Sequence, residues 1–191
     1  MPQNKRILVL PAAALIILTL CLWRLNNPPP TQAEMDLPGE TRQAPAFQLY
    51  DQNSKLLKLD AYLGRHRIVV VFYDGQAGPD ADPVLQELRK FHPALKAESV
   101  VVLGISTALP QENRNNSEQP YPFALLSDAV AADKNSVHTV WGRLVPPPSL
   151  DKPAGTKPAV FLIDRKGQVP WSGDLPQPEA DTRTLISRLL R

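Results

Sequence analysis

The sequence predicts an α/β domain in which helices flank a mixed central sheet, and three observations carry this prediction. Two apolar runs rich in β-branched residues, 68–72 and 100–105, contain no charge and are typical of strands buried inside a parallel sheet. The segment between them places apolar residues at helical spacing. A third apolar run, 159–163, is followed by Asp-Arg-Lys-Gly, which predicts a hairpin. Strands that alternate with helices and close in a hairpin indicate a mixed sheet.

The first half of the domain is predicted to supply short strands and one long helix. Residues 47–50 alternate like a strand, 51–54 form a polar turn, and 56–59 return as a second strand. After the strand at 68–72, a helix is expected to begin near Pro83, because proline suits the first helical position and Asp82 suits the N-cap. Its buried face is predicted to contain Val84, Leu85, Leu88, Phe91 and Leu95.

The second half is predicted to hold shorter elements. A short strand precedes Ser127 and Asp128, which we interpret as the start of a helix continuing to Trp141. Residues 159–163 pair with 168–171 across the turn at 164–167. The segment 143–153, with three consecutive prolines, is either an ordered spacer loop or a polyproline docking segment. A closing helix is predicted to bury Leu185, Ile186, Leu189 and Leu190.

The N-terminal 43 residues predict a membrane anchor and a linker. Residues 1–6 form a basic end that we expect in the cytoplasm, and residues 7–23 carry no charge and are long enough to span a membrane. Residues 24–43 are polar and proline-rich and predict a linker. The domain, residues 44–191, is then expected on the exocytoplasmic side, in a periplasm or lumen. The alternative is a cleaved secretory signal, processed near residues 31–33.

Composition excludes several classes of function. With 21 Lys and Arg against 19 Asp and Glu, the net charge is only +2, which argues against a nucleic-acid partner. The single cysteine, Cys21, excludes a disulfide framework and a cysteine-based zinc site, and it lies inside the predicted membrane span. We predict no cofactor.

Five blocks, in one order along the chain, resemble the thioredoxin-fold redoxins. The resemblance is greatest to the alkyl hydroperoxide reductase and thiol-specific antioxidant (AhpC/TSA, or peroxiredoxin) family, and it covers about residues 44–191. It implies a thioredoxin-like fold and, for an intact member, thiol peroxidase activity. The blocks are Ala44–Asp51, Val69–Tyr73, Val102–Thr107, Pro122–Asp128 and Phe161–Gly167.

The resemblance also implies an active site whose reactive residues this chain lacks. The Thr-x-x-Cys motif of peroxiredoxins falls with its threonine on Gly78 and its cysteine on Ala81, and the family's arginine falls on Pro158. A second register resembles membrane-tethered thiol–disulfide reductases, whose Cys-Gly-Pro-Cys falls on Ala77 to Asp80 and whose cis-proline falls on Pro158. Gly78, Pro79 and Pro158 match that register, but neither of its two cysteines is present. Either register leaves the domain without a thiol nucleophile.

Other candidate residues have simpler interpretations. The carboxylates of Asp74, Asp80 and Asp82 are too few for a calcium loop, so we predict a turn residue at Asp74, a helix cap at Asp80 or Asp82, and no metal site. Ser127-Asp128 with a distant histidine lacks the Gly-x-Ser-x-Gly sequence of a hydrolase nucleophile. Dispersed histidines are expected on the surface: His66, His92 and His138.

The sequence therefore predicts a membrane-anchored thioredoxin-like domain that has lost its thiol chemistry. Its expected role is binding of a protein partner on the exocytoplasmic side, as a scaffold, assembly or chaperone-like module. The competing prediction, which follows from the resemblance, is a thiol oxidoreductase or peroxidase. A small ligand in the vacated pocket is a third possibility. The absence of cysteine at positions 77, 80 and 81 favours the first.

Overall fold

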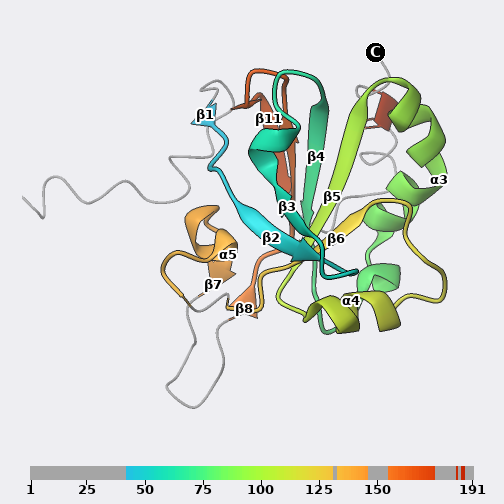
Figure 1. Ribbon diagram of the computed structural model, residues 1–191, viewed down its shortest axis with the longest axis vertical. Coiled ribbons are helices and arrows are strands. Elements are labelled where there is room, and N and C mark those ends of the chain that lie inside the picture. Colours follow the sequence, from blue (N-terminus) through green and yellow to red (C-terminus); the bar gives the residue numbers. More distant parts are fainter. Residues whose placement is uncertain (1–41, 131–132, 146–154, 175–183, 185, 188–191) are drawn as a thin grey trace, which may run out of the picture. The chain divides into compact units, whose positions relative to one another are not determined.

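A seven-stranded mixed sheet organises the computed structural model, which describes residues 42–130, 133–145, 155–174, 184, 186 and 187 (Figure 1). The strand order is β11-β9-β4-β5-β6-β2-β3. Its centre is parallel, because β4 pairs with β5 and β5 with β6, whereas β9 and β11 on one side and β2 and β3 on the other run antiparallel. The strand bounds are β2 Gln48–Asp51, β3 Leu56–Lys58, β4 Arg67–Phe72, β5 Val100–Ser106, β6 Ala124–Ser127, β9 Ala159–Ile163 and β11 Trp171–Asp174.

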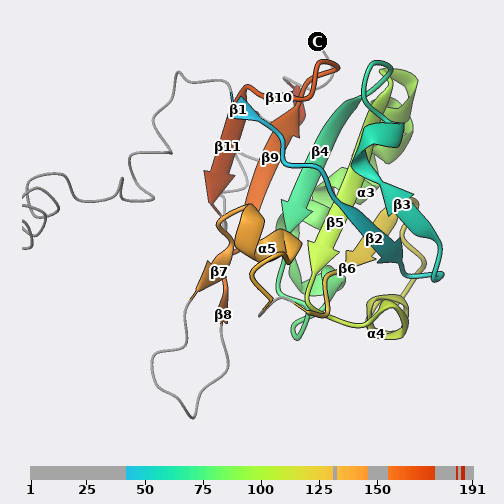
Figure 2. The ribbon, with the colours of Figure 1, turned by 60° about the vertical axis from the view of Figure 1, so that its left-hand side comes forward.

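Successive residues of β4 face opposite sides of the sheet and so belong to two apolar cores. Val69 and Val71 pack with α3 (Pro83–Ala97) and with Ile186, which is 3% exposed. Ile68 and Phe72 point to the other face, where Phe47, Leu59 and Trp141 cover them. Figure 2 shows α3 behind the sheet and α5 (Val137–Val140) on the opposite side. The prediction that β4 and β5 are buried parallel strands is confirmed.

The α3 helix begins where the sequence predicts and presents the predicted face. Asp82 is its N-cap and Pro83 occupies its first turn. The side chains of Val84, Leu85, Leu88 and Leu95 are buried, whereas Phe91 remains 38% exposed. The N-terminus of α3 directly follows the loop that leaves β4, so the loop and the first turn of the helix form one structural unit.

The hairpin after β9 forms, but its return strand begins at Trp171, the last residue of the predicted one. The turn at 164–167 is present, but the strand that pairs with β9 is β11, with Trp171 opposite Leu162. Residues Gln168–Val169 form β10, which pairs instead with β1, Arg42–Gln43. Pro170 separates β10 from β11, because a proline has no N–H to continue a ladder. The folded region therefore includes Arg42 and Gln43, which the sequence assigned to the linker.

The region after β6 is less helical than predicted. No helix begins at Ser127, which ends β6, and the described helix in this region is the single turn α5, whose N-cap is Ser136. Trp141 follows it and is buried. A short ribbon of β7 (Leu144–Val145) and β8 (Gly155–Thr156) comes next. A second short helix, α4 (Pro110–Asn115), follows β5.

Several predicted segments lie outside the described residues. These are the membrane span 7–23, most of the linker 24–43, the consecutive prolines at 146–148 and most of the closing helix. Within the described part of the chain, no helix combines the length and the apolar character that crossing a membrane requires.

Candidate functional site

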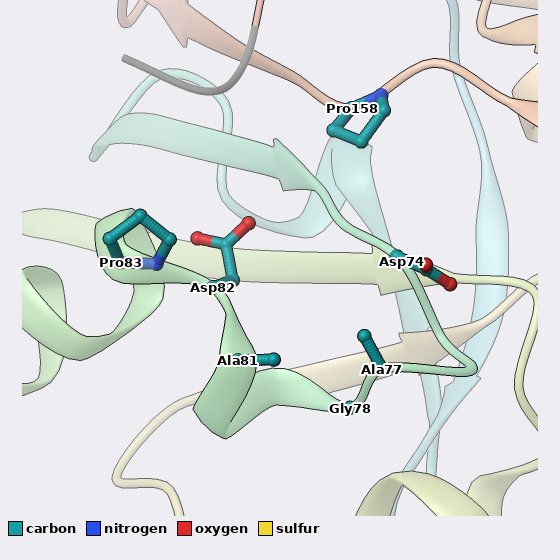
Figure 3. Close-up of a pocket in the computed structure, with 7 residues that line it drawn as sticks. All are labelled: Asp74, Ala77, Gly78, Ala81, Asp82, Pro83 and Pro158. Carbon is teal, nitrogen blue, oxygen red and sulfur yellow. The ribbon is translucent and has the colours of Figure 1, made fainter. Parts of the chain in front are cut away.

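A cavity of about 190 Å³ lies where the β4–α3 loop meets Pro158 (Figure 3). Pro158 immediately precedes β9, which is antiparallel to β4, so the cavity lies between the C-terminal end of β4 and the N-terminal end of β9. The carboxyl ends of parallel strands are the usual place for ligand sites in α/β proteins. The lining residues are Asp74, Ala77, Gly78, Ala81, Asp82, Pro83 and Pro158.

Four of the five positions singled out from the sequence come together in this cavity. Ala77, Gly78, Ala81 and Pro158 line it, and Asp80 does not. Gly78, Ala81 and Pro158 are the positions onto which the peroxiredoxin register places threonine, cysteine and arginine. The thioredoxin register needs position 80 to face position 77, and the structure directs Asp80 elsewhere. The geometry therefore agrees better with the peroxiredoxin register.

Asp80 fastens the loop to the segment that follows α4. Its Oδ1 accepts a hydrogen bond from the Tyr121 hydroxyl at 2.8 Å and forms an ion pair with Arg89 at 3.4 Å. Its Oδ2 accepts a hydrogen bond from the Glu118 N–H at 2.7 Å. The Arg89 guanidinium lies 4.8 Å from the centre of the Tyr121 ring. Burial, together with the neighbouring Asp80 carboxylate, raises the pKa of Tyr121 well above its ordinary value. Asp80 is thus a positioning residue of the loop.

The backbone of the loop is shaped by Gly78. Its φ is +82°, a conformation that side chains with a Cβ rarely adopt. A Cβ at this position would also lie 3.1 Å from the carbonyl oxygen of Asn116. Threonine, the residue that the peroxiredoxin register requires here, is β-branched and would be strained. At Gly78 the loop conformation therefore favours glycine over the threonine that this register would place there.

Asp82 is one of the two carboxylates that line the cavity, the other being Asp74. Its Oδ1 accepts the backbone N–H groups of Val84 and Leu85, both at 2.9 Å, which is the geometry of an N-cap. Among the described residues, no group donates a hydrogen bond to its Oδ2. Burial raises the pKa of the Asp82 carboxyl, against the opposing effect of those two hydrogen bonds. In Figure 3 the Asp82 carboxylate projects from the start of α3, while that of Asp74 turns away from it.

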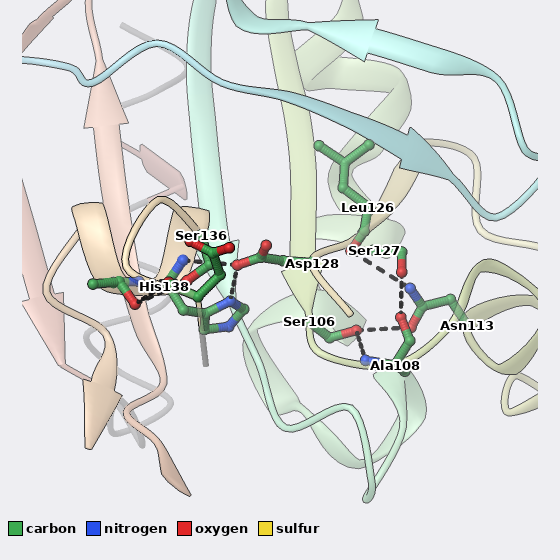
Figure 4. Close-up of polar contacts among 10 residues, drawn as sticks. Ser106, Ala108, Asn113, Leu126, Ser127, Asp128, Ser136 and His138 are labelled. Carbon is green, nitrogen blue, oxygen red and sulfur yellow. Dashed lines mark hydrogen bonds and ion pairs between the residues drawn. The ribbon is translucent and has the colours of Figure 1, made fainter. Parts of the chain in front are cut away.

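A separate group of buried polar residues follows β6 (Figure 4). The Asp128 Oδ2 accepts the backbone N–H of His138 at 2.8 Å and contacts its Nδ1 at 2.7 Å. The His138 side chain is 0% exposed and packs edge-on against Phe72, so the prediction of a surface histidine is wrong at this position. Burial opposes ionisation of Asp128, but the hydrogen bonds from His138 outweigh it and hold the pKa of Asp128 below its ordinary value.

The Asp128–His138 pair is not part of a hydrolase triad. The Ser127 hydroxyl donates to the Ala108 carbonyl at 2.6 Å, and within the described residues the His138 Nε2 has no hydrogen-bond partner. No serine is therefore placed for activation by this histidine. No group of three potential metal ligands converges anywhere in the described residues.

Sequence reasoning missed a second buried network, which follows β5. Asn113 Oδ1 accepts hydrogen bonds from the Tyr73 hydroxyl at 2.7 Å and the Ser106 hydroxyl at 2.9 Å. Asn113 is 1% exposed, although it belongs to the polar run Pro-Gln-Glu-Asn-Arg-Asn. Only the tertiary structure distinguishes it from its exposed neighbours, and no local signal in the sequence would have found it.

Comparison with known proteins identifies the family. The AhpC/TSA family profile matches residues 41–172. The chain belongs to the AhpC/TSA family. Within this family it is 30% identical to the chloroplastic peroxiredoxin Q of Populus jackii over 128 residues, which cover 65% of this chain and 55% of that protein. The chain thus matches about half the length of this relative.

Solved structures support the thioredoxin-like fold of this AhpC/TSA family member. Peroxidoxin BcpB from Mycobacterium tuberculosis has a TM-score of 0.67 at 21% identity, covering 79% of this chain and 95% of that one. A peroxiredoxin Q from Xanthomonas campestris has a TM-score of 0.62 at 18% identity, covering 75% and 90%. At these identities, the similarity shows the fold alone.

Proposed function

We propose that this AhpC/TSA family member binds a protein partner, performs no thiol redox chemistry, and is held at a membrane by residues 7–23. One observation carries the proposal: the cavity at the start of α3 is lined by methyl groups, proline rings, backbone and two carboxylates. Its loop is nevertheless held in place by Asp80, which accepts hydrogen bonds from the Tyr121 hydroxyl and the Glu118 N–H. A fixed, open cavity without a reactive group suits binding rather than catalysis.

The chemistry of peroxide reduction explains why these residues do not suffice. The reaction requires a nucleophile that attacks one peroxide oxygen and is itself oxidised, as a thiolate is to a sulfenic acid. Alanine and proline side chains have no lone pair, and aspartate cannot give up the two electrons. The single cysteine, Cys21, belongs to the predicted membrane span, where a thiolate is disfavoured.

The alternative is a thiol peroxidase, and the names of its relatives favour it. They are peroxiredoxins, and the fold is shared over most of the described chain. Peroxide turnover separates the two proposals. The full-length chain in detergent micelles should consume hydrogen peroxide and reduce a disulfide substrate no faster than buffer does. A rate within the usual enzyme range of about 1–1,000 per second that is lost in a Cys21→Ser variant would establish the thiol peroxidase instead, because Cys21 is the single thiol of the sequence.

Membrane anchoring is tested independently. The full-length chain should remain with membranes after washing with high salt or carbonate, and its C-terminal domain should be digested by protease only from the side opposite Lys5 and Arg6. Release of a chain that begins near Glu34 would support the cleaved signal.

A further inference from the structure

The cavity at the start of α3 has the size and lining for a single side chain. Its volume, about 190 Å³, is below the roughly 300–1,000 Å³ typical of pockets for drug-sized ligands. Ala77, Ala81 and Pro83 are exposed, so the mouth is reachable from solvent, and Pro158 forms an apolar wall. These surfaces suit an aliphatic stem rather than a polar one.

The open oxygen of Asp82 selects the head of the ligand, since the other carboxylate in the lining, Asp74, turns away from it (Figure 3). Asp82 Oδ1 is occupied by two backbone N–H groups, which leaves Oδ2 as a single acceptor. A guanidinium binds best to both oxygens of a carboxylate, whereas an ammonium is a point charge that one oxygen can hold. Burial also raises the pKa of Asp82, so a bound cation would relieve the cost of its desolvation.

The surrounding charges favour a cation from a protein over one from a lipid. No lining residue is basic, and Asp74 adds a second carboxylate near the mouth. Two cations next to lining residues or to the loop are engaged elsewhere: Lys157, which precedes Pro158, pairs with Asp174, and Arg89 pairs with Asp80. An ethanolamine headgroup would bring a phosphate close to Asp74 and Asp82, which would repel it.

We propose that this cavity receives a lysine side chain of the protein partner, with its ammonium on Asp82 Oδ2 and its four methylenes against Ala77, Ala81 and Pro158. Lysine combines an apolar stem with a compact charged head, which matches the walls and the single acceptor. This inference rests on the proposed function, because it identifies the side chain through which the partner would be recognised.

The test measures binding of Nα-acetyl-lysine-N-methylamide to the full-length chain in uncharged micelles, by ligand-detected NMR. We expect saturable binding to wild type and a weakening of about tenfold or more in Asp82→Asn, because a charge-assisted hydrogen bond is lost. Asparagine caps a helix as well as aspartate does, so this variant should unfold at the same denaturant concentration as wild type. The matched control, Asp60→Asn, removes an exposed carboxylate outside the lining and should change binding by less than about twofold.

Three outcomes would overturn the inference: no binding to wild type, equal binding to Asp82→Asn, or equally tight binding of the Nε-acetylated analogue, which has no charge. Vesicles of phosphatidylethanolamine that bind wild type but not Asp82→Asn would replace the protein partner by a lipid. Peroxide turnover by wild type would instead refute the proposed function, whatever the lysine analogue does. The two failures are therefore distinguishable.

Discussion

Asp82 is half-buried and Asp128 is buried, and both carboxylates lie beyond the C-terminal ends of parallel strands, yet their surroundings shift their pKa values in opposite directions. Asp128 follows β6, is 2% exposed, and accepts hydrogen bonds from the His138 side chain and backbone, which lower its pKa. Asp82 follows the loop after β4, caps α3 through one oxygen and keeps the other open to a cavity, and its pKa is raised. The Asp128 carboxylate thus finds its hydrogen-bond donors within the fold, whereas the Asp82 carboxylate is hydrogen-bonded through one oxygen only.

This difference separates structural from functional polar groups at this edge. Buried polar groups that find partners within the chain contribute to stability. A carboxylate held in an apolar cavity with an open oxygen costs stability, and such a cost is typical of sites kept for a ligand. Asp128 and His138, whose side chains are paired as in a catalytic site, therefore belong to the core. The candidate site is lined instead by residues without an obvious catalytic group, together with Asp74 and Asp82.

The largest effect is expected at the satisfied carboxylate. Asp128→Ala leaves the His138 Nδ1 and backbone N–H without their acceptor in a buried site. We expect the free energy of unfolding to fall by about 3 kcal/mol, measured by urea denaturation of the full-length chain. Glu87→Ala, which removes a partly exposed pair with Lys90, is the control and should cost less than about 0.5 kcal/mol. Equal losses in the two variants would show that the Asp128 pair is not structural.

The pH dependence should follow from the same pair. Because the pKa of Asp128 is lower in the folded state than the ordinary value of about 3.9, its ionised form contributes stability above that value, and this contribution is lost as the pH falls through the folded-state pKa. The contribution of Asp82 to stability has the opposite sign, because its pKa is higher in the folded state. Its ionisation therefore costs stability as the pH rises from its unfolded-state pKa towards its folded-state pKa. The pKa of Asp174 is lowered in the folded state, as that of Asp128 is, so its contribution to stability has the same sign.

Asp128→Ala should therefore flatten, without abolishing, the loss of stability between about pH 6 and about pH 2. The measurement is the free energy of unfolding in urea across that range, for wild type and the variant. Parallel curves would mean that the Asp128–His138 contact does not stabilise the ionised carboxylate.

A smaller effect is expected where the loop is fastened. Asp80→Ala removes the acceptor of the Glu118 N–H and one of two acceptors near the Tyr121 hydroxyl, which keeps the Pro79 carbonyl at 2.9 Å. Because Tyr121 retains an acceptor and the exposed Glu118 N–H can bind water, we expect a loss of about 1 kcal/mol in the free energy of unfolding. Hydrogen exchange of the Glu118 amide should accelerate more than that of the Leu88 amide inside α3. Unchanged exchange at Glu118 would contradict the positioning role of Asp80.

The sequence was sufficient for the fold because the fold depends on strong local patterns. The runs of β4, β5 and β9 and the capped, amphipathic α3 each have one reasonable interpretation. The pairing of β10 with β1 was not predictable, since it joins two-residue segments that are more than 120 residues apart. The length of the helix that ends near Trp141 was overestimated, because only the single turn α5 is helical there and its apolar residues are buried by tertiary contacts.

The candidate site was only partly predictable. The resemblance located Ala77, Gly78, Ala81 and Pro158, and the cap at Asp82 followed from the helix pattern. The direction of Asp80 depends on Tyr121, 41 residues away, and the burial of His138 depends on Asp128, 10 residues away, and no local pattern specifies either partner. The open oxygen of Asp82 is likewise a property of the folded loop.

The most direct test of this account is the stability of Asp82→Asn in the full-length chain. Asparagine retains the cap of α3 and removes the buried charge, so the free energy of unfolding at about pH 7 should lie within about 0.5 kcal/mol of wild type, or above it. That result would distinguish Asp82, left open for a ligand, from Asp128, satisfied by the fold. A loss of about 2 kcal/mol or more would show that the Asp82 charge is needed by the fold itself and would contradict the assignment of the cavity as a binding site.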